Sequence, residues 1–340
     1  MPEETKKTNN GIAKAIKRIL LIVLETVLLF VIGVYGLLYT LAKGPSVTAR
    51  NLFVHSMNET SALKFIPSLF LKDEEIAEIL ATDEEIQVED MDVSLLSDSA
   101  EEDDIWVTED TDGDGIIIEE VKGGSYTGYM MIVKDPMRVQ VAIDEKNFGG
   151  KGHTVEEFCE MFDAVAAMNG GGFEDENGQG NGGSPDSVVV YDGEIFGWYG
   201  TKNGFVGIDD EGILHVDCQN TAAIREANIQ YGCAYGPILV ENGKVSPNLR
   251  EDGTGINPRT AIGQRADKSI LMLVIDGRHV KSLGATYNDL AQVMLDYGAI
   301  NAGNMDGGSS TLMYYNHEYV NNKAAVIGIR PIPTVWIVTP

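Results

Sequence analysis

One uninterrupted apolar run, Ile19 to Leu41, limits how this chain can fold more than any other feature. It reads ILLIVLETVLLFVIGVYGLLYTL, and a helix needs roughly 20 such residues to cross a bilayer. Its single charge, Glu25, lies within about two helical turns of Arg18 and can reach the membrane interface. The run therefore predicts one transmembrane helix over residues 19–41, in contact with the lipid bilayer.

The charges on either side of this run predict its orientation. Residues 1–18 carry five basic and two acidic side chains, whereas Lys43 is the one base directly after the run. Because basic flanks stay in the cytoplasm, we expect a cytoplasmic tail over 1–18 and a single-pass protein whose body lies outside the cytoplasm. A cleaved signal peptide is the alternative, but its apolar region is shorter and LAKGPS is a poor cleavage site.

The chain is strongly acidic after the run. Its 52 acidic and 25 basic residues give a formal net charge of -27, which repels nucleic acid and removes it from the expected partners. Residues 73–120 carry 21 acids and no Lys or Arg. We assign 42–115 to a juxtamembrane helix followed by an acidic linker. That helix either lies at the membrane or self-associates, or it packs on the domain as a spacer; the oligomeric state is not predicted.

The acidic linker contains one sequence that resembles a calcium loop. Asp110, Asp112, Asp114 and Gly115 match positions 1, 3, 5 and 6 of an EF-hand loop. Position 12 is Val121 instead of Glu, and no helical pattern precedes the loop. We therefore interpret it as a turn into the first strand, and we predict no metal or other cofactor.

From residue 116 onward the pattern changes to short strands and tight turns. Hairpin turns are predicted at Asp192-Gly193, Glu211-Gly212 and Asn242-Gly243. One helix should begin at a capping box formed by Thr154 and Glu157, and a second should run from Thr286 to Gly298. Because regular βαβ winding is missing, we expect an α+β domain over 116–340, with mixed or antiparallel sheets and two or more packed helices.

Several familiar catalytic motifs are missing from the sequence. It contains no G-x-x-x-x-G-K-[ST], no G-x-S-x-G and no H-E-x-x-H, and its five histidines are scattered. Its three cysteines form no C-x-x-C pair and are interpreted as core residues. Metal-dependent cleavage at phosphorus is therefore the weakest of the hypotheses considered.

Polar residues without a folding role gather in four groups at the ends of predicted strands. The groups are Asn169 with Gly170; Arg259 with Thr260; Asp276 with Arg278; and Asp306 with Gly307, Gly308, Ser309 and Ser310. Any one of them can be an ordinary turn, but four in one domain predict a shared pocket. Glycine amides, hydroxyls and arginine bind phosphate, whereas paired carboxylates perform glycosyl chemistry. Together they indicate cleavage of a sugar–phosphate bond at the anomeric carbon.

In this order the motifs MNGG, PRTAIG, DGR and N-x-DGG resemble the phosphodiester glycosidase domain family, over roughly residues 120–340. That family includes bacterial surface proteins, some of them labelled exopolysaccharide-biosynthesis proteins. The resemblance implies hydrolysis of a sugar-1-phosphodiester, without dividing the roles of nucleophile and acid between the aspartates. It implies catalytic residues Asp306, Asp276, Arg259 and Asn169, and substrate-binding residues Gly170, Thr260, Arg278, Gly307, Gly308, Ser309 and Ser310. Ser309 departs from the family pattern, which has a third glycine there.

Two functions from different classes follow from these observations. The leading hypothesis is a membrane-anchored extracytoplasmic hydrolase that cleaves glycosyl-phosphate bonds in envelope or exported polysaccharide. The alternative is a non-catalytic glycan-binding or scaffold protein of an exopolysaccharide or cell-envelope machine, which the acidic linker and the apolar juxtamembrane segment favour slightly. The sequence names neither the sugar nor the aglycone.

Overall fold

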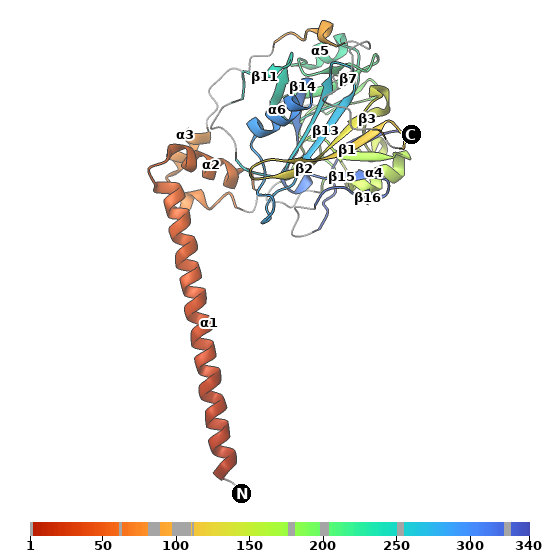
Figure 1. The fold of residues 1–340 in the computed structure, drawn as a ribbon. Coiled ribbons are helices and arrows are strands. Elements are labelled where there is room, and N and C mark those ends of the chain that lie inside the picture. Colours follow the sequence, from red (N-terminus) through yellow and green to blue (C-terminus); the bar gives the residue numbers. More distant parts are fainter. Residues whose placement is uncertain are drawn as a thin grey trace.

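A long N-terminal helix, a small helical segment and a globular α+β domain follow one another along the chain (Figure 1). The computed structural model describes residues 3–60, 63–80, 89–96, 110, 112–175, 181–197, 204–249, 255–322 and 328–340. Much of the predicted acidic linker, including 81–88 and 97–109, lies outside the described residues.

Helix α1 spans Glu3–Lys43 and extends beyond the predicted run at both ends. Its part from Ile16 to Lys43 is long and apolar enough to cross a membrane. None of the 18 residues in its most apolar stretch is buried by the rest of the protein. Exposed apolar side chains on this scale need an apolar environment. Length and composition thus meet the requirements of a membrane span, which a signal sequence near the N-terminus meets equally well.

The helical segment packs against the end of α1. It consists of α2 (Val47–Asn58), η1 (Pro67–Leu69) and α3 (Asp73–Leu80). Its small core is formed by Ala42, Phe53, Val54 and Leu71. Ser46 caps α2 by accepting a hydrogen bond from the amide of Ala49 at 3.2 Å. Within the predicted juxtamembrane segment, the sequence DEEIAEIL forms α3, whereas α2 was not predicted.

A seven-stranded antiparallel sheet forms the centre of the domain. Its strands, in spatial order, are β1 (Ile116–Lys122), β2 (Thr127–Val133), β13 (Ile270–Ile275), β12 (Arg259–Arg265), β14 (Ala299–Met305), β10 (Ile238–Glu241) and β11 (Lys244–Val245). Every strand pair described in it is antiparallel. Its central strands are buried along almost their whole length.

Two five-stranded antiparallel sheets complete the domain. One contains β16 (Glu318–Tyr319), β15 (Met313–Tyr315), β4 (Ala166–Asn169), β17 (Val335–Val338) and β3 (Val139–Ala142). The other contains β6 (Glu194–Phe196), β5 (Val189–Tyr191), β9 (Ile229–Ala234), β7 (Phe205–Asp209) and β8 (Leu214–His215). The remaining helices among the described residues are α4 (Val155–Phe162), α5 (Thr221–Glu226) and α6 (Tyr287–Asp296). The same residues contain the short 3-10 turns η2 (Val93–Leu95), η4 (Pro136–Arg138), η5 (Glu145–Asn147) and η7 (Gly308–Ser310). The predicted α+β class is confirmed, with antiparallel sheets.

The core lies on both faces of the seven-stranded sheet because successive side chains of a strand point to opposite faces. On one face, Ile262 and Val274 belong to a cluster shared with the two smaller sheets. On the other face, Leu273 packs with Leu290 and Met294 of α6. Strands β12, β13 and β14 are therefore held from both sides, and so are the loops that leave their ends.

Local signals in the sequence correspond to the observed turns and caps. Capping boxes begin α4 at Thr154 and α6 at Thr286. The residue pairs at 192–193 and 242–243 both have positive φ, as a two-residue hairpin turn requires. Asp110 accepts hydrogen bonds from the amides of Gly113 and Gly115 at 2.8 and 3.1 Å, and β1 follows directly. The interpretation of this segment as a turn into the first strand is confirmed.

Candidate functional site

The polar groups predicted from the sequence meet at one end of the seven-stranded sheet. In antiparallel register, Arg259 at the start of β12 pairs with Ile275 at the end of β13, and Thr260 pairs with Met305 at the end of β14. Asp276 and Asp306 directly follow those two strand ends. Antiparallel order thus brings residues from three separate motifs to one edge.

Asn169, at the end of β4, connects the second sheet to this edge. Its amide nitrogen donates to the carbonyl of Asp306 at 2.6 Å. Its amide oxygen accepts from the hydroxyl of Thr260 at 2.8 Å and from the backbone of Leu312 at 3.1 Å. The carbonyl of Gly170 accepts from the amide of Asp306 at 3.1 Å. Asn169 is buried, and these hydrogen bonds hold Thr260, Leu312 and Asp306 in place; its predicted catalytic role stays a prediction.

Asp306 is a carboxylate of the site with a raised pKa. It is half-buried, and burial raises its pKa to about 6. Hydrogen bonds from the Ser310 hydroxyl and the Gly307 amide oppose that rise. The carboxylate of Asp186 adds to it, and the charge of Arg330 reduces it. A carboxylate with a pKa near neutrality, in a polar surrounding, has the properties of an acid–base or nucleophilic group.

The loop after Asp306 supports that carboxylate. The amide of Gly307 donates to its Oδ1 at 2.9 Å, and the amide of Gly308 donates to the carbonyl of Pro258 at 2.9 Å. A side chain at Gly307 would stand 2.8 Å from that same carbonyl, so glycine is needed for this close approach. These amides, and the Ser310 hydroxyl, bind protein atoms here; their role as donors to a phosphate stays a prediction.

Arg259 is the buried cation of the site. Its Nη2 donates to Glu59 at 2.7 Å and to the carbonyl of Gly255 at 2.6 Å, and its Nε donates to the carbonyl of Ala285 at 3.1 Å. The guanidinium carbon stands 4.0 Å from the ring centre of Tyr287. The guanidinium is therefore fixed in position with a carboxylate already bound to it.

Glu59 follows α2 and reaches this cation from the juxtamembrane segment. Its carboxylate also accepts from the side-chain amide of Asn257 at 2.7 Å and from the amide of Gly255 at 3.2 Å. Three residues earlier, the Ser56 hydroxyl accepts from the amide of Ile256 at 2.9 Å. The segment 56–60 thus lies directly on the loop that precedes β12. No sequence motif pointed to Glu59.

Arg278 provides the second, more exposed cation. Its Nη2 donates to the Thr60 hydroxyl at 3.1 Å and to the side chain of Asn257 at 3.2 Å. Its Nη1 lies 3.4 Å from the hydroxyl of Ser309. The residue that replaces the family's third glycine therefore contacts an arginine, and Arg278 links the Asp306 loop to the juxtamembrane segment.

Asp276 has a different environment from Asp306. It is 1% exposed, and its carboxylate accepts from the side chain and the backbone of Asn322 at 2.6 and 3.0 Å and from Asn321 at 3.1 Å. The hydroxyl of Ser282 donates to its carbonyl at 2.6 Å. Through these contacts Asp276 fixes the loop that contains Ser282 and the loop that contains Asn321 and Asn322. Its predicted role as a second reacting carboxylate stays a prediction.

The structure adds Tyr235 and Asp186, which the motifs did not indicate. The pKa of Tyr235 is raised well above its ordinary value by burial and by the charge of Asp306, while Arg259 lowers it, so the phenol responds to both sides of the site. A side chain at Gly172 would meet both the Tyr235 ring and the Asp186 carboxylate at 2.8 Å. The glycine run after Asn169 was the one sequence signal near them.

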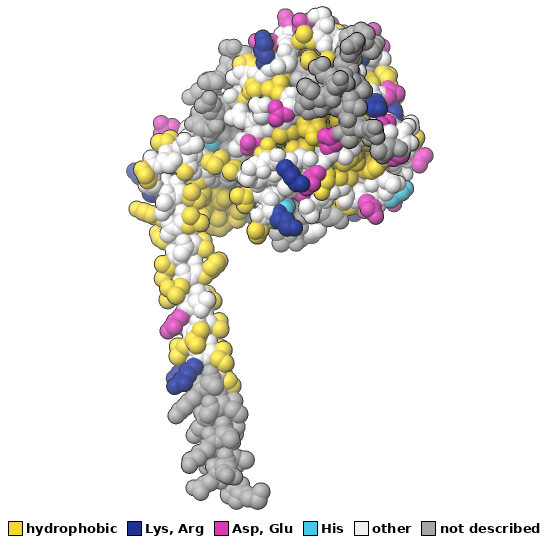
Figure 2. Space-filling model, in the orientation of Figure 1, with side chains coloured by type: hydrophobic (Ala, Val, Ile, Leu, Met, Phe, Trp, Pro, Cys, Tyr) yellow, Lys and Arg dark blue, Asp and Glu magenta, His cyan; other side chains and the backbone are white. Residues whose placement is uncertain are grey.

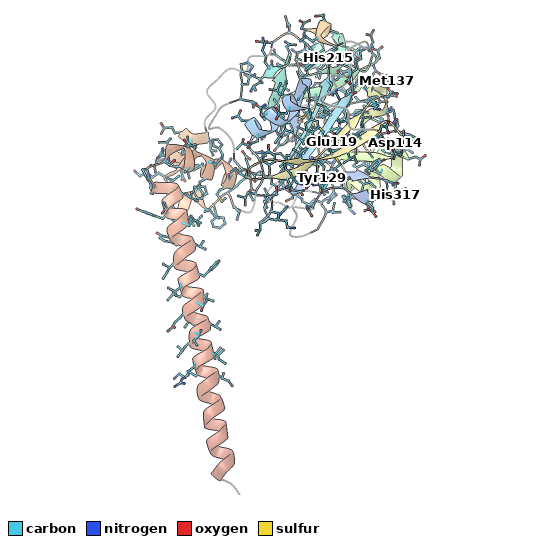
Figure 3. The ribbon with its side chains drawn as sticks, viewed as in Figure 1. Asp114, Glu119, Tyr129, Met137, His215 and His317 are labelled. Carbon is cyan, nitrogen blue, oxygen red and sulfur yellow. The ribbon has the colours of Figure 1, made fainter. Side chains whose placement is uncertain are left out.

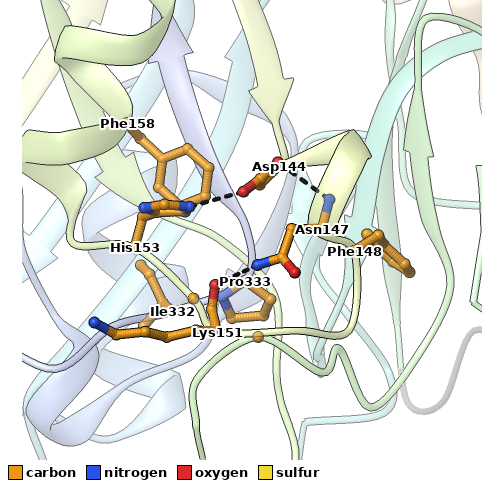
Figure 4. A pocket seen from close by; sticks show the side chains of 10 residues that line it. Asp144, Asn147, Phe148, Lys151, His153, Phe158, Ile332 and Pro333 are labelled. Carbon is orange, nitrogen blue, oxygen red and sulfur yellow. Dashed lines mark hydrogen bonds and ion pairs between the residues drawn. The ribbon is translucent and has the colours of Figure 1, made fainter.

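Other polar clusters lie apart from these residues. A hollow lined by Asp144, His153 and Phe158 contains none of the predicted site residues, and His153 contacts Asp144 there at 2.9 Å (Figure 4). The ligand atoms of His215, Asp217 and Cys218 lie within 4.8 Å of one another. Burial lowers the pKa of His215, but hydrogen bonds to Asp209 and Asp217 outweigh it and raise the pKa to about 9. His215 is therefore held between two carboxylates by charge-assisted hydrogen bonds.

Comparison with known proteins agrees with this geometry. Residues 162–339, slightly more than half of the chain, match the phosphodiester glycosidase family. The chain is 29% identical over 199 residues to the SPbeta prophage-derived protein YomE of Bacillus subtilis (55% of this chain, 30% of YomE). It is 24% identical over 210 residues to bovine N-acetylglucosamine-1-phosphodiester alpha-N-acetylglucosaminidase (56% of this chain, 39% of that protein). The chain spans less than half the length of these curated relatives.

Two solved structures share the fold. The zebrafish N-acetylglucosamine-1-phosphodiester alpha-N-acetylglucosaminidase catalytic domain, auto-inhibited by its pro-peptide, has a TM-score of 0.54 at 21% identity and covers 66% of this chain and 82% of its own. A Burkholderia pseudomallei protein has a TM-score of 0.50 at 17% identity and covers 63% and 74%. Since the family match covers more than half of the sequence, this chain belongs to the phosphodiester glycosidase family.

Proposed function

We propose that this protein hydrolyses sugar-1-phosphodiesters outside the cytoplasm, in envelope or exported polysaccharide, while α1 holds it in the membrane. The family and the hydrolases among its relatives support the reaction class. The observation that carries the proposal is that two groups lie at the same sheet edge. One is Asp306, whose pKa is raised to about 6, and the other is the fixed cation Arg259. The charge asymmetry around 19–41 supports the orientation.

The proposed chemistry divides the site into two parts. Water adds to the anomeric carbon, the bond from that carbon to the phosphate oxygen breaks, and the phosphate leaves as a monoester. Asp306 acts on the sugar, as nucleophile or base. A phosphate leaving group is a weak base that needs charge stabilisation more than protonation, and Arg259 and Arg278 supply that stabilisation. Asn169 holds the Asp306 backbone in place through its 2.6 Å hydrogen bond.

The direct test is turnover of a panel of sugar-1-phosphodiesters by the purified full-length protein. We expect free sugar as one product, with the phosphate retained on the other. Absence of turnover by folded protein across a broad panel contradicts the proposal. Glycan binding without turnover would instead identify the scaffold function.

We further infer that the segment 56–60 covers the two arginines of the site. In this arrangement the Glu59 carboxylate occupies the place of the substrate phosphate. The Glu59 carboxylate accepts hydrogen bonds from Arg259, Asn257 and Gly255. A bound phosphodiester would need the same donors. Auto-inhibition by a pro-peptide, named for the zebrafish enzyme, supports this inference. A substrate must then displace Glu59 before it can bind.

Glu59→Gln is therefore expected to raise kcat/KM about tenfold, which corresponds to roughly 1.4 kcal/mol of competing interaction. Glutamine keeps the shape and one acceptor but removes the charge that binds Arg259. The measurement is steady-state hydrolysis by the full-length protein. Glu78→Gln, at an exposed position in α3, is the matched control and should leave kcat/KM unchanged. Unchanged or lower activity of a folded Glu59→Gln variant contradicts the inference.

A further inference from the structure

We propose that the substrate is a lipid-linked sugar phosphodiester whose aglycone lies in the bilayer, and that the loop between β13 and α6 contacts the bilayer surface. The proposal rests on the proposed function and on α1 as the membrane anchor. It assigns the substrate class that the family relationship leaves open.

The first support is the position of the site close to the end of α1. Helix α1 ends at Lys43 and α2 begins at Val47. A helix of 12 residues such as α2 is about 18 Å long. At its far end Glu59 contacts Arg259, and Thr60 contacts Arg278. Figure 1 shows α2 between the end of α1 and the domain. The site residues therefore lie on the side of the domain that faces the end of α1.

The second support is the composition of the loop that follows Asp276. Val280 is 101% exposed and Leu283 is 57% exposed, next to the basic side chains of Arg278 and Lys281. Exposed apolar side chains flanked by bases are typical of segments that enter a lipid interface. In water, a fully exposed valine at a loop tip contributes nothing to the fold.

The loop is held firmly in this position. His279 and Ser282 form a β-bridge, and the buried Ser282 hydroxyl donates to the carbonyl of Asp276 at 2.6 Å. The amide of Leu283 donates to the carbonyl of Ser125 at 2.8 Å. The apolar tip is thus a fixed projection of the same edge that carries Arg278.

Apolar side chains also gather at the junction with α1. Leu63, Phe65 and Leu69 are exposed in the helical segment, at 36%, 60% and 65%. Figure 2 shows apolar surface continuing from α1 onto this junction. A formal net charge of -27 keeps most of the domain away from anionic lipid, so contact is confined to such local apolar and basic positions.

A lipid-linked sugar phosphodiester matches this arrangement group by group. Its phosphate lies at headgroup depth, between a sugar in water and an apolar chain in the bilayer. Arg278 and Arg259 can bind the phosphate, while Val280 and Leu283 face the lipid. Hydrolysis breaks the bond between the anomeric carbon and the phosphate oxygen. The lipid phosphate stays in the membrane, and the sugar, which takes the hydroxyl from water, is released.

The first experiment measures membrane contact without activity. The three native cysteines are buried, so Val280→Cys in the full-length protein can be labelled selectively with an environment-sensitive fluorophore. In lipid nanodiscs that contain shallow nitroxide-labelled lipid, we expect at least twofold quenching. Met137→Cys is the control, because Met137 is 53% exposed and Figure 3 places it on the part of the domain away from α1. Equal quenching at the two positions overturns the proposal.

The second experiment compares two substrates with the same sugar. One carries a prenyl phosphate in nanodiscs, and the other carries a short alkyl phosphate in solution. We expect kcat/KM to be at least tenfold higher for the prenyl substrate, and Val280→Asp to reduce that ratio toward one while Met137→Ser leaves it unchanged. Turnover of neither substrate removes the proposed function. Equal turnover of both overturns the lipid-linked class and leaves the proposed function standing.

Discussion

Asp306→Asn is expected to lower kcat for a sugar-1-phosphodiester by about a thousandfold, while the protein stays folded. Asparagine keeps the size of the side chain and an acceptor for the Gly307 amide, which donates at 2.9 Å, but it removes the charge that we propose acts on the sugar. Loss of a group that performs acid–base or nucleophilic chemistry costs on the order of 10² to 10⁴ in rate. Steady-state and single-turnover hydrolysis measure the effect. Retention of more than a tenth of wild-type kcat contradicts a reacting role.

The same carboxyl predicts a characteristic pH dependence. Burial raises the pKa of Asp306 to about 6 from an ordinary value of 3.8. Because we propose that its ionised form acts on the sugar, kcat/KM should rise with pH through about 6. A raised carboxyl pKa stabilises the fold below the unfolded pKa, and that contribution is lost as the pH rises through the folded pKa.

The stability of the wild type and that of the Asp306→Asn variant should therefore diverge between about pH 4 and pH 6. Above this window the ionised Asp306 disfavours folding by up to about 3 kcal/mol, since a shift of about two units corresponds to that energy. We expect Asp306→Asn to melt several degrees higher than the wild type at pH 8 and at a similar temperature at pH 4. Identical melting curves at both pH values would show that burial does not penalise this charge.

Asp276→Ala is the change with the largest expected effect on stability, a loss of about 3–5 kcal/mol. It leaves three donors from Asn321 and Asn322 without the buried carboxylate that they share. In a domain of this size the melting temperature should fall by about 10 °C, at roughly 2–4 °C per kcal/mol. Thermal unfolding followed by circular dichroism in detergent measures it.

The paired control separates this structural role from a chemical one. Asp210→Ala removes an exposed carboxylate and should change the melting temperature by less than about 2 °C, since such surface changes stay near 0.5 kcal/mol. If Asp276 is instead the second reacting carboxylate, Asp276→Asn should melt like the wild type and lose turnover. That pattern would reverse the division of roles between the two aspartates.

The parts of the fold that depend on neighbouring residues could be predicted from the sequence. The capping boxes at Thr154 and Thr286 and the turn at Asn242-Gly243 each involve residues a few positions apart. The missed helix, α2, has its buried residues Phe53 and Val54 side by side, so its sequence shows little helical periodicity, and packing against α1 stabilises it. The assignment of β14 and β15 to different sheets depends on contacts distant in the sequence, which no local pattern encodes.

The candidate site was predictable in its motifs but not in its contacts. Asn169, Arg259 and Asp306 stand out because each polar residue ends, begins or directly follows an apolar strand. The carboxylate bound to Arg259 comes from Glu59, 200 residues earlier, in a segment whose composition suggested only a spacer or an interfacial helix. Tyr235 and Asp186 carry no motif, so their place near Asp306 follows from the packing of three sheets.

The ion pair between Glu59 and Arg259 has a consequence for how substrate binding would be controlled in the proposed function. The Glu59 carboxylate belongs to the same chain, so in the proposed competition it acts as a tethered ligand, whose effective concentration is in the millimolar range for a short link. Diluting the protein cannot release it. With α1 as the proposed membrane anchor, its tilt in a thinner or thicker bilayer should move the start of α2 and change the strength of the proposed competition. A membrane enzyme built in this way would respond to the thickness of the lipid around it.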